Sequence, residues 1–262
     1  MDIGNPLDFT GRVVLVTGGT KGIGAAVAEA FLAAGADVVV CGRTAPDTVP
    51  AAGGRSAVFV AADVRDAEAA AGLVDSTAER FGRLDVLVNN AGGSPDADAA
   101  TVSPRFVEKI VALNLLAPFY VAQAAHRVMR TRPGRGSVVN IGSVSAHQPQ
   151  PGTAAYTAAK AGLLALTKAL ALEWAPEVRV NHITTGLVRT EGAAGVYGAD
   201  GGASVAGVIP MARMAAPEDV ARACLFLASD LARYVDGADL AVHGGGEFPS
   251  RYLAARHAEA RH

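Results

Sequence analysis

The chain has few cysteines and almost no net charge. It contains 2 Cys and 6 His among 262 residues, and its formal net charge is −2. Two cysteines make neither a disulfide framework nor a metal motif, and the histidines lack metal-ligand spacing. Nucleic-acid binding needs concentrated Lys and Arg, so this balance argues against nucleic acid as the main partner. We therefore expect no metal site, no nucleic-acid partner and a reducing compartment.

The sequence also lacks a recognisable membrane span or signal peptide. No apolar run approaches the roughly 18 residues that a span requires. The N-terminal segment Met1–Arg12 has no basic stretch leading into an apolar core. Hydrophobic residues make up 50% of the chain and charged residues 18%, a composition that excludes disorder. We expect a cytoplasmic globular protein without a membrane partner.

Short apolar runs alternate with longer Ala- and Leu-rich stretches along most of the chain. The runs predict strands over residues 12–17, 37–41, 57–61, 84–89, 137–141, 178–183 and 239–242. The longer stretches predict helices over 22–34, 66–81, 103–130, 153–174 and 217–229. The strand runs are continuously apolar, as expected when helices cover both faces of a parallel sheet. The sequence predicts an α/β fold, a single Rossmann-type domain over residues 1–262 with a doubly wound sheet of about seven parallel strands.

Two segments fall outside this alternation. Residues 186–211 are rich in Gly and Ala and make one long irregular insertion. A loop of this length in a compact domain is usually functional or mobile, so we expect a mobile loop that binds substrate, with Tyr197 as a candidate contact. We expect residues 247–262 to form a C-terminal tail that is loosely packed at its end.

A glycine-rich turn, TGGTKGIG over residues 17–24, follows the first predicted strand and opens the first predicted helix. Its glycines allow a tight turn, a close approach to a pyrophosphate and packing of the helix on the sheet. The helix N-terminus offers N–H groups to the phosphates. Glycines alone are weak evidence in a chain with 30 of them, but the strand–turn–helix context predicts a dinucleotide site. The predicted contacts from this turn are Gly18, Thr20, Lys21, Gly22, Ile23 and Gly24.

The end of the second predicted strand bears on the choice between NAD and NADP. An NAD site usually places an acidic residue there, about 20 residues after the glycine turn. This strand ends in Cys41-Gly42-Arg43-Thr44, without a carboxylate, and Lys21 lies in the glycine turn. Arg43 and Lys21 would pair with the 2′-phosphate of NADP; the alternative is that both are ordinary surface cations. We expect NADP(H) to be preferred, with NAD(H) as the alternative.

Two further motifs carry a family resemblance. Asn89-Asn90-Ala91-Gly92 follows the fourth predicted strand, and residues 156–160, YTAAK, lie at the start of a predicted helix. With the glycine turn, they resemble the short-chain dehydrogenase/reductase family over about residues 11–246. The resemblance implies a metal-independent oxidoreductase that transfers a hydride between a nicotinamide and a ketone or secondary alcohol, most simply an NADPH-dependent carbonyl reductase.

The resemblance also implies site residues by position. The catalytic set it implies is Asn114, Ser143, Tyr156 and Lys160. The further cofactor contacts it implies are Asp63, Val64, Asn90, Ala91, Gly92, Tyr156, Lys160, Gly186, Val188 and Thr190. It implies a homotetramer or homodimer built on helices at about 103–131 and 153–175. Relatives usually carry Pro-Gly where this chain has Thr185-Gly186, so we expect a looser start to the loop.

The implied chemistry agrees with the spacing of the residues. Tyr156 and Lys160 are four positions apart, so their side chains emerge on one helix face. A free Tyr titrates near pH 10, and an adjacent ammonium favours its phenolate. Tyr156 would then protonate a carbonyl oxygen that Ser143 holds by a hydrogen bond. Lys160 would also bind ribose hydroxyls, and in the family Asn114 supports a water that links Lys160 to solvent.

Several alternatives stay open at this point. Ser145 lies on the same segment as Ser143 and competes for its role. His147 is either a substrate contact or a solvated loop residue. The rival functions are an NAD-preferring alcohol dehydrogenase, a 3-oxoacyl-thioester reductase and, from another class, a non-catalytic cofactor-binding regulatory protein. The sequence selects neither a substrate nor a physiological direction or product stereochemistry.

Overall fold

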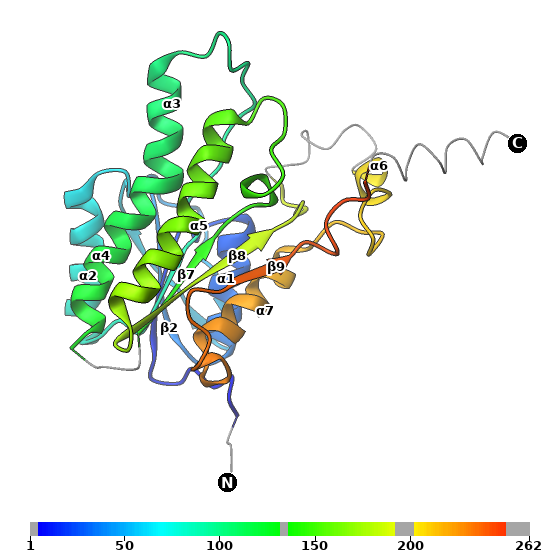
Figure 1. Cartoon of the computed structure of the whole chain (residues 1–262). Helices are drawn as coiled ribbons and strands as arrows, with labels where there is room; N and C mark the ends of the chain where they lie inside the picture. Colours follow the sequence, from blue (N-terminus) through cyan, green and yellow to red (C-terminus); the bar gives the residue numbers. More distant parts are fainter. Residues whose placement is uncertain (1–4, 132–135, 192–201, 250–262) are drawn as a thin grey trace, which may run out of the picture.

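The computed structural model is built around a seven-stranded parallel sheet (Figure 1). It describes residues 5–131, 136–191 and 202–249. The strands lie in the order β5-β2-β1-β6-β7-β8-β9, which changes direction between β1 and β6, the position where α/β sheets open a ligand crevice. Their bounds are β1 (Val13–Thr17), β2 (Asp37–Gly42), β5 (Val58–Ala61), β6 (Val86–Asn89), β7 (Gly136–Ile141), β8 (Val178–Thr185) and β9 (Asp239–Val242). The predicted Rossmann-type sheet is confirmed.

Helices cover both faces of the sheet (Figure 1). On one face lie α1 (Gly22–Ala33) and α7 (Pro217–Ala228). On the other face lie α2 (Ala67–Phe81), α4 (Ala117–Met129) and α5 (Ala154–Trp174). The side chains of β1 alternate between the two layers: Val14 and Val16 pack under α1, and Val13 and Leu15 pack under α2 and α4. Burial on both faces explains why the strand runs read as continuously apolar.

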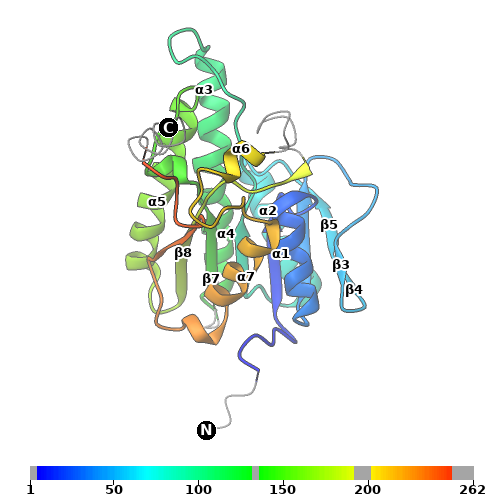
Figure 2. The ribbon, with the colours of Figure 1, turned by 90° about the vertical axis from the view of Figure 1, so that its right-hand side faces the viewer.

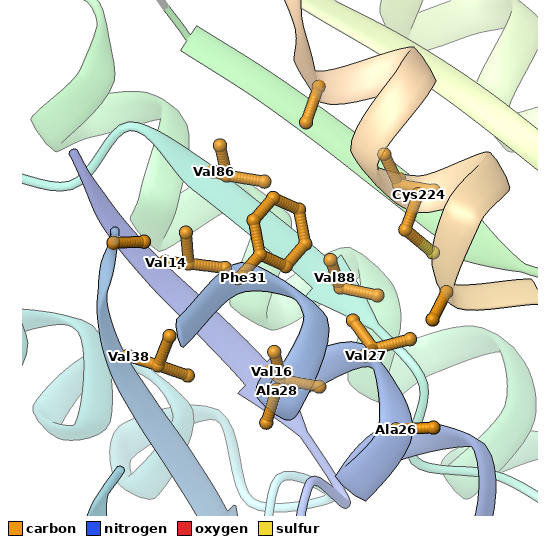
Figure 3. Close-up of a cluster of buried hydrophobic side chains, with 14 of the residues drawn as sticks. Val14, Val16, Ala26, Val27, Ala28, Phe31, Val38, Val86, Val88 and Cys224 are labelled. Carbon is orange, nitrogen blue, oxygen red and sulfur yellow. The ribbon is translucent and has the colours of Figure 1, made fainter. Parts of the chain in front are cut away.

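The α1 layer is centred on an aromatic side chain. Phe31 of α1 lies among valines of β1, β2 and β6, and Cys224 of α7 borders the same cluster (Figure 3). Phe9 packs edge to face on Phe31, with ring centroids 4.9 Å apart. Burial of a side chain of this size contributes about 1.5–3 kcal/mol to the stability of the fold. This layer fixes the start of α1, and with it the glycine turn.

One long helix crosses the opposite layer. It consists of α3 (Pro104–Val111), a π-helical turn (Ala112–Leu116) and α4, and it covers the single predicted helix at 103–130. Within the part of the chain that the structure describes, it alone is long and apolar enough to cross a membrane, with a mean hydropathy of 1.2. One such helix is weak evidence, because core helices pass the same test; here Val121 and Ala125 pack into the core. The π-helical turn was not predicted, and such turns are frequent at functional sites.

The structure also contains short elements that the sequence did not predict. β3 (Ala51–Ala52) and β4 (Arg55–Ser56) form an antiparallel hairpin beside β5 (Figure 2). The insertion at 186–211 contains a short helix, α6 (Ala203–Ala206). Elements this short are too brief to show a periodicity. The remaining part of the insertion at 192–201, with the candidate residue Tyr197, and most of the predicted tail lie outside the described residues.

Candidate active site

A cavity of about 670 Å³ lies at the carboxyl ends of β1, β2, β6 and β7. It brings together most of the predicted cofactor residues: Gly18, Lys21, Gly22, Ile23, Arg43, Asp63, Val64, Asn90, Ala91, Gly92, Tyr156, Lys160 and Thr190. Four predicted contacts, Thr20, Gly24, Gly186 and Val188, are not among its lining residues. Its position at the reversal of strand order is the one expected for a dinucleotide.

The glycine turn forms the wall of this cavity next to α1. Gly18 and Gly22 have φ angles of +61° and +55°, a conformation that side chains with a Cβ rarely adopt. Gly24 faces inward, and a Cβ there would lie 2.3 Å from the Gly18 carbonyl oxygen. Asn90 fixes the turn, because its Nδ2 donates to the carbonyls of Thr17 and Gly18, each at 3.0 Å. Gly24 therefore acts by close packing, which explains why it does not line the cavity.

The start of α1 has no side-chain cap. Lys21 occupies the cap position without a side-chain hydrogen bond, and the first turn contains no acidic residue. In α2, by contrast, the Asp66 carboxylate accepts hydrogen bonds from the N–H groups of Glu68 and Ala69, both at 2.9 Å. Among the residues that the structure describes, no side chain caps the first N–H groups of α1, which lie beside a cavity lined by Gly22 and Ile23. This arrangement fits a pyrophosphate.

Cations line the cavity near the end of β2. Lys21 and Arg43 are exposed, and a third cation, Arg65, was missed in the sequence. Arg65 pairs with Asp63, its Nε lying 2.9 Å from Oδ1 and its Nη2 contacting Oδ2. The hydrogen bond from Arg65 lowers the pKa of Asp63, and the charge of Arg43 adds to this effect. Asp63, a predicted cofactor contact, is therefore paired with Arg65 in the structure. The signal for Arg65 in the sequence was its position two residues after Asp63.

Tyr156 and Lys160 lie near the start of α5 on the same cavity wall. The Lys160 Nζ donates to the Ile141 carbonyl at 2.8 Å and lies 5.7 Å from the centre of the Tyr156 ring. Lys160 is only 4% exposed, and burial lowers its pKa to about 8. At neutral pH it is still mostly protonated, so a cation stands beside the phenol and favours its ionisation.

Asn114 lies in the π-helical turn and is completely buried. Its Oδ1 accepts from the Gly93 N–H at 2.9 Å, and its Nδ2 donates to the carbonyls of Gly93 and Ile110. A Cβ on Gly92 would lie 2.8 Å from the Asn114 Oδ1 and 3.3 Å from the Lys160 Nζ. The absence of a side chain at Gly92 thus leaves room for the side chains of both Asn114 and Lys160 beside the loop that follows β6.

Ser143 follows β7 at the edge of the cavity. Its Oγ accepts a hydrogen bond from the Ser145 N–H at 3.2 Å, which starts a 3₁₀ turn over Val144–Ala146. Ser143 is not itself a lining residue, although Gly142 before it is. Ser145 is 6% exposed and Ser143 is half-buried, so the more accessible hydroxyl is that of Ser143.

Two of the residues considered at the substrate end, His147 and Thr185, have defined hydrogen-bond partners. His147 does not line the cavity; its Nε2 lies 2.8 Å from the Asp239 Oδ2. Thr185 is buried and does not loosen the start of the loop, because its Oγ1 donates to the Gly142 carbonyl at 2.8 Å. Gly186 donates its N–H to the Val242 carbonyl at 3.0 Å. A side-chain hydrogen bond therefore fixes the position where relatives carry proline.

Comparison with known proteins agrees with this geometry. A family model described as enoyl-(acyl carrier protein) reductase matches residues 18–247, which include the glycine turn from Gly18 onward and every residue that lines the cavity. The chain belongs to the short-chain dehydrogenase/reductase family. It is therefore an NAD(P)-dependent oxidoreductase that acts on hydroxyl or carbonyl groups of small molecules.

Relatives in this short-chain family have diverse substrates. D-threitol dehydrogenase of Mycolicibacterium smegmatis is 37% identical over 90% of this chain and 92% of its own length. A 3-oxoacyl-[acyl-carrier-protein] reductase of Synechocystis is also 37% identical, over 90% of this chain and 97% of its own. Among solved structures, the aldohexose dehydrogenase of Thermoplasma acidophilum matches with a TM-score of 0.83 and 29% identity, over 91% of this chain and 94% of that one.

Proposed function

We propose that this enzyme is an NADPH-dependent carbonyl reductase that interconverts a ketone and a secondary alcohol. The observation that carries the proposal is the pairing of Tyr156 with the buried cation Lys160 on the wall of a cavity whose far end is lined by cations. The first feature supplies an acid for a carbonyl oxygen, and the second suits a cofactor with an additional phosphate.

In the reductive direction Tyr156 is the general acid. When bound in the cavity beside Tyr156 and Lys160, the reduced nicotinamide would supply the hydride for the carbonyl carbon. The phenol O–H of Tyr156 breaks as its proton moves to the carbonyl oxygen, which becomes the alcohol hydroxyl. The nearby ammonium of Lys160 stabilises the resulting phenolate. Ser143 donates a hydrogen bond to the same oxygen and orients it, and Asn114 supports the return of a proton through Lys160.

The preference for NADPH rests on Arg43, Arg65 and Lys21. β2 ends at Gly42 and is followed by Arg43. No carboxylate stands at this position to accept hydrogen bonds from ribose hydroxyls and repel a phosphate. A charge-assisted hydrogen bond contributes about 1.5–3 kcal/mol, so one arginine on the 2′-phosphate corresponds to roughly tenfold or more in affinity. We expect NADPH to bind at least tenfold more tightly than NADH. We expect Arg43→Ala to remove most of this difference.

The test combines cofactor titration with turnover. Loss of absorbance at 340 nm is followed with NADPH and with NADH over a panel of ketones that includes 3-oxoacyl thioesters, because a relative reduces that class. The Tyr156→Phe variant should keep its affinity for NADPH and lose at least a hundredfold in kcat. Retained turnover would contradict the role of Tyr156, and equal dissociation constants for the two cofactors would contradict the NADPH preference.

We also propose a cytoplasmic homodimer or homotetramer that assembles through the helices at 104–129 and 154–174. Leu172 on α5 is 86% exposed and Leu116 is 38% exposed, which leaves apolar side chains on these helices uncovered in the single chain. Both cysteines are free and buried, in keeping with a reducing compartment. Light scattering on the purified protein gives the number of subunits, and a monomeric mass would contradict the proposed assembly.

A further inference from the structure

A cluster of four polar side chains lies beside the segment 142–147, which contains Ser143, and takes no part in the chemistry above. It consists of His147, His182, Thr184 and Asp239, and we call it the β8–β9 cluster. Asp239 begins β9, the edge strand of the sheet, and is paired with His182 of β8 in the parallel register. Residues paired across neighbouring strands project to the same face, which brings the two side chains together.

The Asp239 carboxylate is the centre of this cluster. Its Oδ1 lies 2.8 Å from the His182 Nδ1 and accepts from the Thr184 Oγ1 at 2.7 Å. Its Oδ2 lies 2.8 Å from the His147 Nε2. Burial raises the pKa of Asp239, but hydrogen bonds from Thr184 and His182 outweigh it, and the net pKa is lowered. An ionised carboxylate only accepts hydrogen bonds, so His182 carries its proton on Nδ1.

The other side of the His182 ring covers Gly142. His182 is fully buried, and its Nε2 has no hydrogen-bond partner among the described residues. A Cβ on Gly142 would lie 2.0 Å from the His182 Cε1 and 2.1 Å from Nε2, so the ring occupies the space beside the glycine. Burial lowers the pKa of His182, and the charges of Lys160 and His147 lower it further. The hydrogen bond and the charge of Asp239 raise this pKa, but the net pKa is lowered, so the ring is neutral.

Gly142 is also fixed through its own backbone. Its N–H donates to the Ile183 carbonyl at 2.8 Å, and its carbonyl accepts from the Thr185 Oγ1 at 2.8 Å. β8 thus holds Gly142 by a ring contact and two hydrogen bonds. Because Ser143 is the next residue, the direction in which its side chain leaves the backbone is set by these contacts.

His147 fixes the far end of the same loop. It follows the 3₁₀ turn that begins after Ser143, and its side chain is 49% exposed on the outer side of Asp239. Asp239 therefore contacts both ends of the segment 142–147: the first through the His182 ring, and the second through the His147 Nε2. Ser143 lies between these two points.

We propose that Asp239, through His182 and His147, is a positioning residue that orients the Ser143 hydroxyl toward the carbonyl oxygen of the substrate. The inference rests on the proposed function, in which Ser143 binds that oxygen. A cluster that only stabilised the sheet edge would affect folding in the same way whether or not residue 143 carried a hydroxyl. A positioning cluster acts on turnover through Ser143, and this difference can be measured.

The test is a double-mutant cycle with Ser143→Ala. Asp239→Ala should lower kcat about tenfold or more and leave the dissociation constant of NADPH within about twofold. In the Ser143→Ala background the same change should cost less than about twofold, because no hydroxyl remains to be positioned. An equal loss in both backgrounds would overturn the proposal. Asp230→Asn, an exposed carboxylate at the opposite end of the sheet, is the matched control and should leave kcat unchanged.

A second pair of variants tests the cluster at His147, so that the result does not depend on the substitution of the largely buried Asp239. His147→Gln keeps an N–H donor near the Nε2 position and should retain kcat, whereas His147→Leu should repeat the loss seen for Asp239→Ala. His147 is half-exposed, so both variants should fold. Equal kcat values for the two would overturn the role of the His147–Asp239 contact.

A spectroscopic measurement separates this proposal from the proposed function. The ¹⁵N shifts of the His182 ring should show a protonated Nδ1 and a bare Nε2, and Asp239→Ala should change that pattern. A protonated Nε2 in the wild-type protein would overturn the geometry of the cluster, with or without turnover. Absence of turnover over the whole carbonyl panel would instead contradict the proposed function. In an active enzyme, additive effects of Asp239→Ala and Ser143→Ala on kcat would contradict the positioning role alone.

Discussion

The buried charge of Lys160 makes a prediction about stability that needs no substrate. Burial lowers the pKa of this side chain from 10.5 to about 8. Below pH 8 the lysine is charged in both the folded and the unfolded chain, and the folded state carries the cost of the buried charge. Between pH 8 and pH 10.5 the folded chain releases the proton first, so the contribution of Lys160 to the free energy of unfolding rises with pH over this window.

The size of the effect follows from the same two values. The full difference between the two pKa values of Lys160 corresponds to about 3 kcal/mol in the free energy of unfolding. Of this, about 2 kcal/mol develops between pH 7 and pH 9.5. Lys160→Met removes the titration but keeps an unbranched apolar side chain. The variant should therefore gain stability relative to the wild type at pH 7, less the lost hydrogen bond to Ile141, and most of that relative gain should disappear by pH 9.5.

The assay is urea unfolding of both proteins without cofactor, at equal protein concentration and at the two pH values. Groups remote from Lys160 titrate alike in the two proteins, so the change in their stability difference reports on Lys160 and on the side chains that its charge acts on, Tyr156 and His182. Lys168→Met, an exposed lysine on the same helix, is the control and should show a difference that does not depend on pH. A pH-independent difference for Lys160→Met would refute the depressed pKa.

Further predictions concern glycines and thiols. Gly142→Ala should lower Tm because its Cβ meets the His182 ring, and adding His182→Ala should restore part of the loss by making room. Gly24→Ala should lower the free energy of unfolding by about 1–3 kcal/mol and weaken NADPH binding. Gly72→Ala on α2, where a Cβ would meet nothing within 4 Å, should raise the free energy of unfolding by roughly 0.5–1 kcal/mol. Urea unfolding measures both changes in stability, and NADPH titration measures the binding. Both buried cysteines should resist Ellman's reagent in the native protein and react in urea, since burial raises the pKa of each thiol.

The sequence predicted those parts of the molecule that are determined by residues close to one another along the chain. Each long helix and each sheet strand has its own hydrophobic pattern, and the glycine turn is contiguous from residue 17 to residue 24. The π-helical turn at Asn114 was missed because it interrupts a helix without any break in apolar spacing. The β3–β4 hairpin was missed because two-residue strands show no alternation.

The β8–β9 cluster was missed for a different reason. Asp239 is 57 residues from His182 and 92 from His147, and only the sheet order brings the three together. His147 drew attention because it lies close to Ser143 along the chain, but its partner Asp239 lies on β9. Side chains that meet through the register of parallel strands leave no local spacing to detect, so their contacts require the structure.

The end of β7 connects the two parts of the site. Lys160 donates to the Ile141 carbonyl, and His182 and Thr185 hold Gly142, the next residue. The helix that carries the acid and the strands that carry the β8–β9 cluster therefore act on two consecutive residues, Ile141 and Gly142, directly before Ser143. A displacement of this segment changes the surroundings of the lysine and the direction of the serine hydroxyl together. For that reason the effect of Asp239 on the serine has to be separated from Lys160 by the cycle with Ser143→Ala, which leaves the Ile141 contact in place.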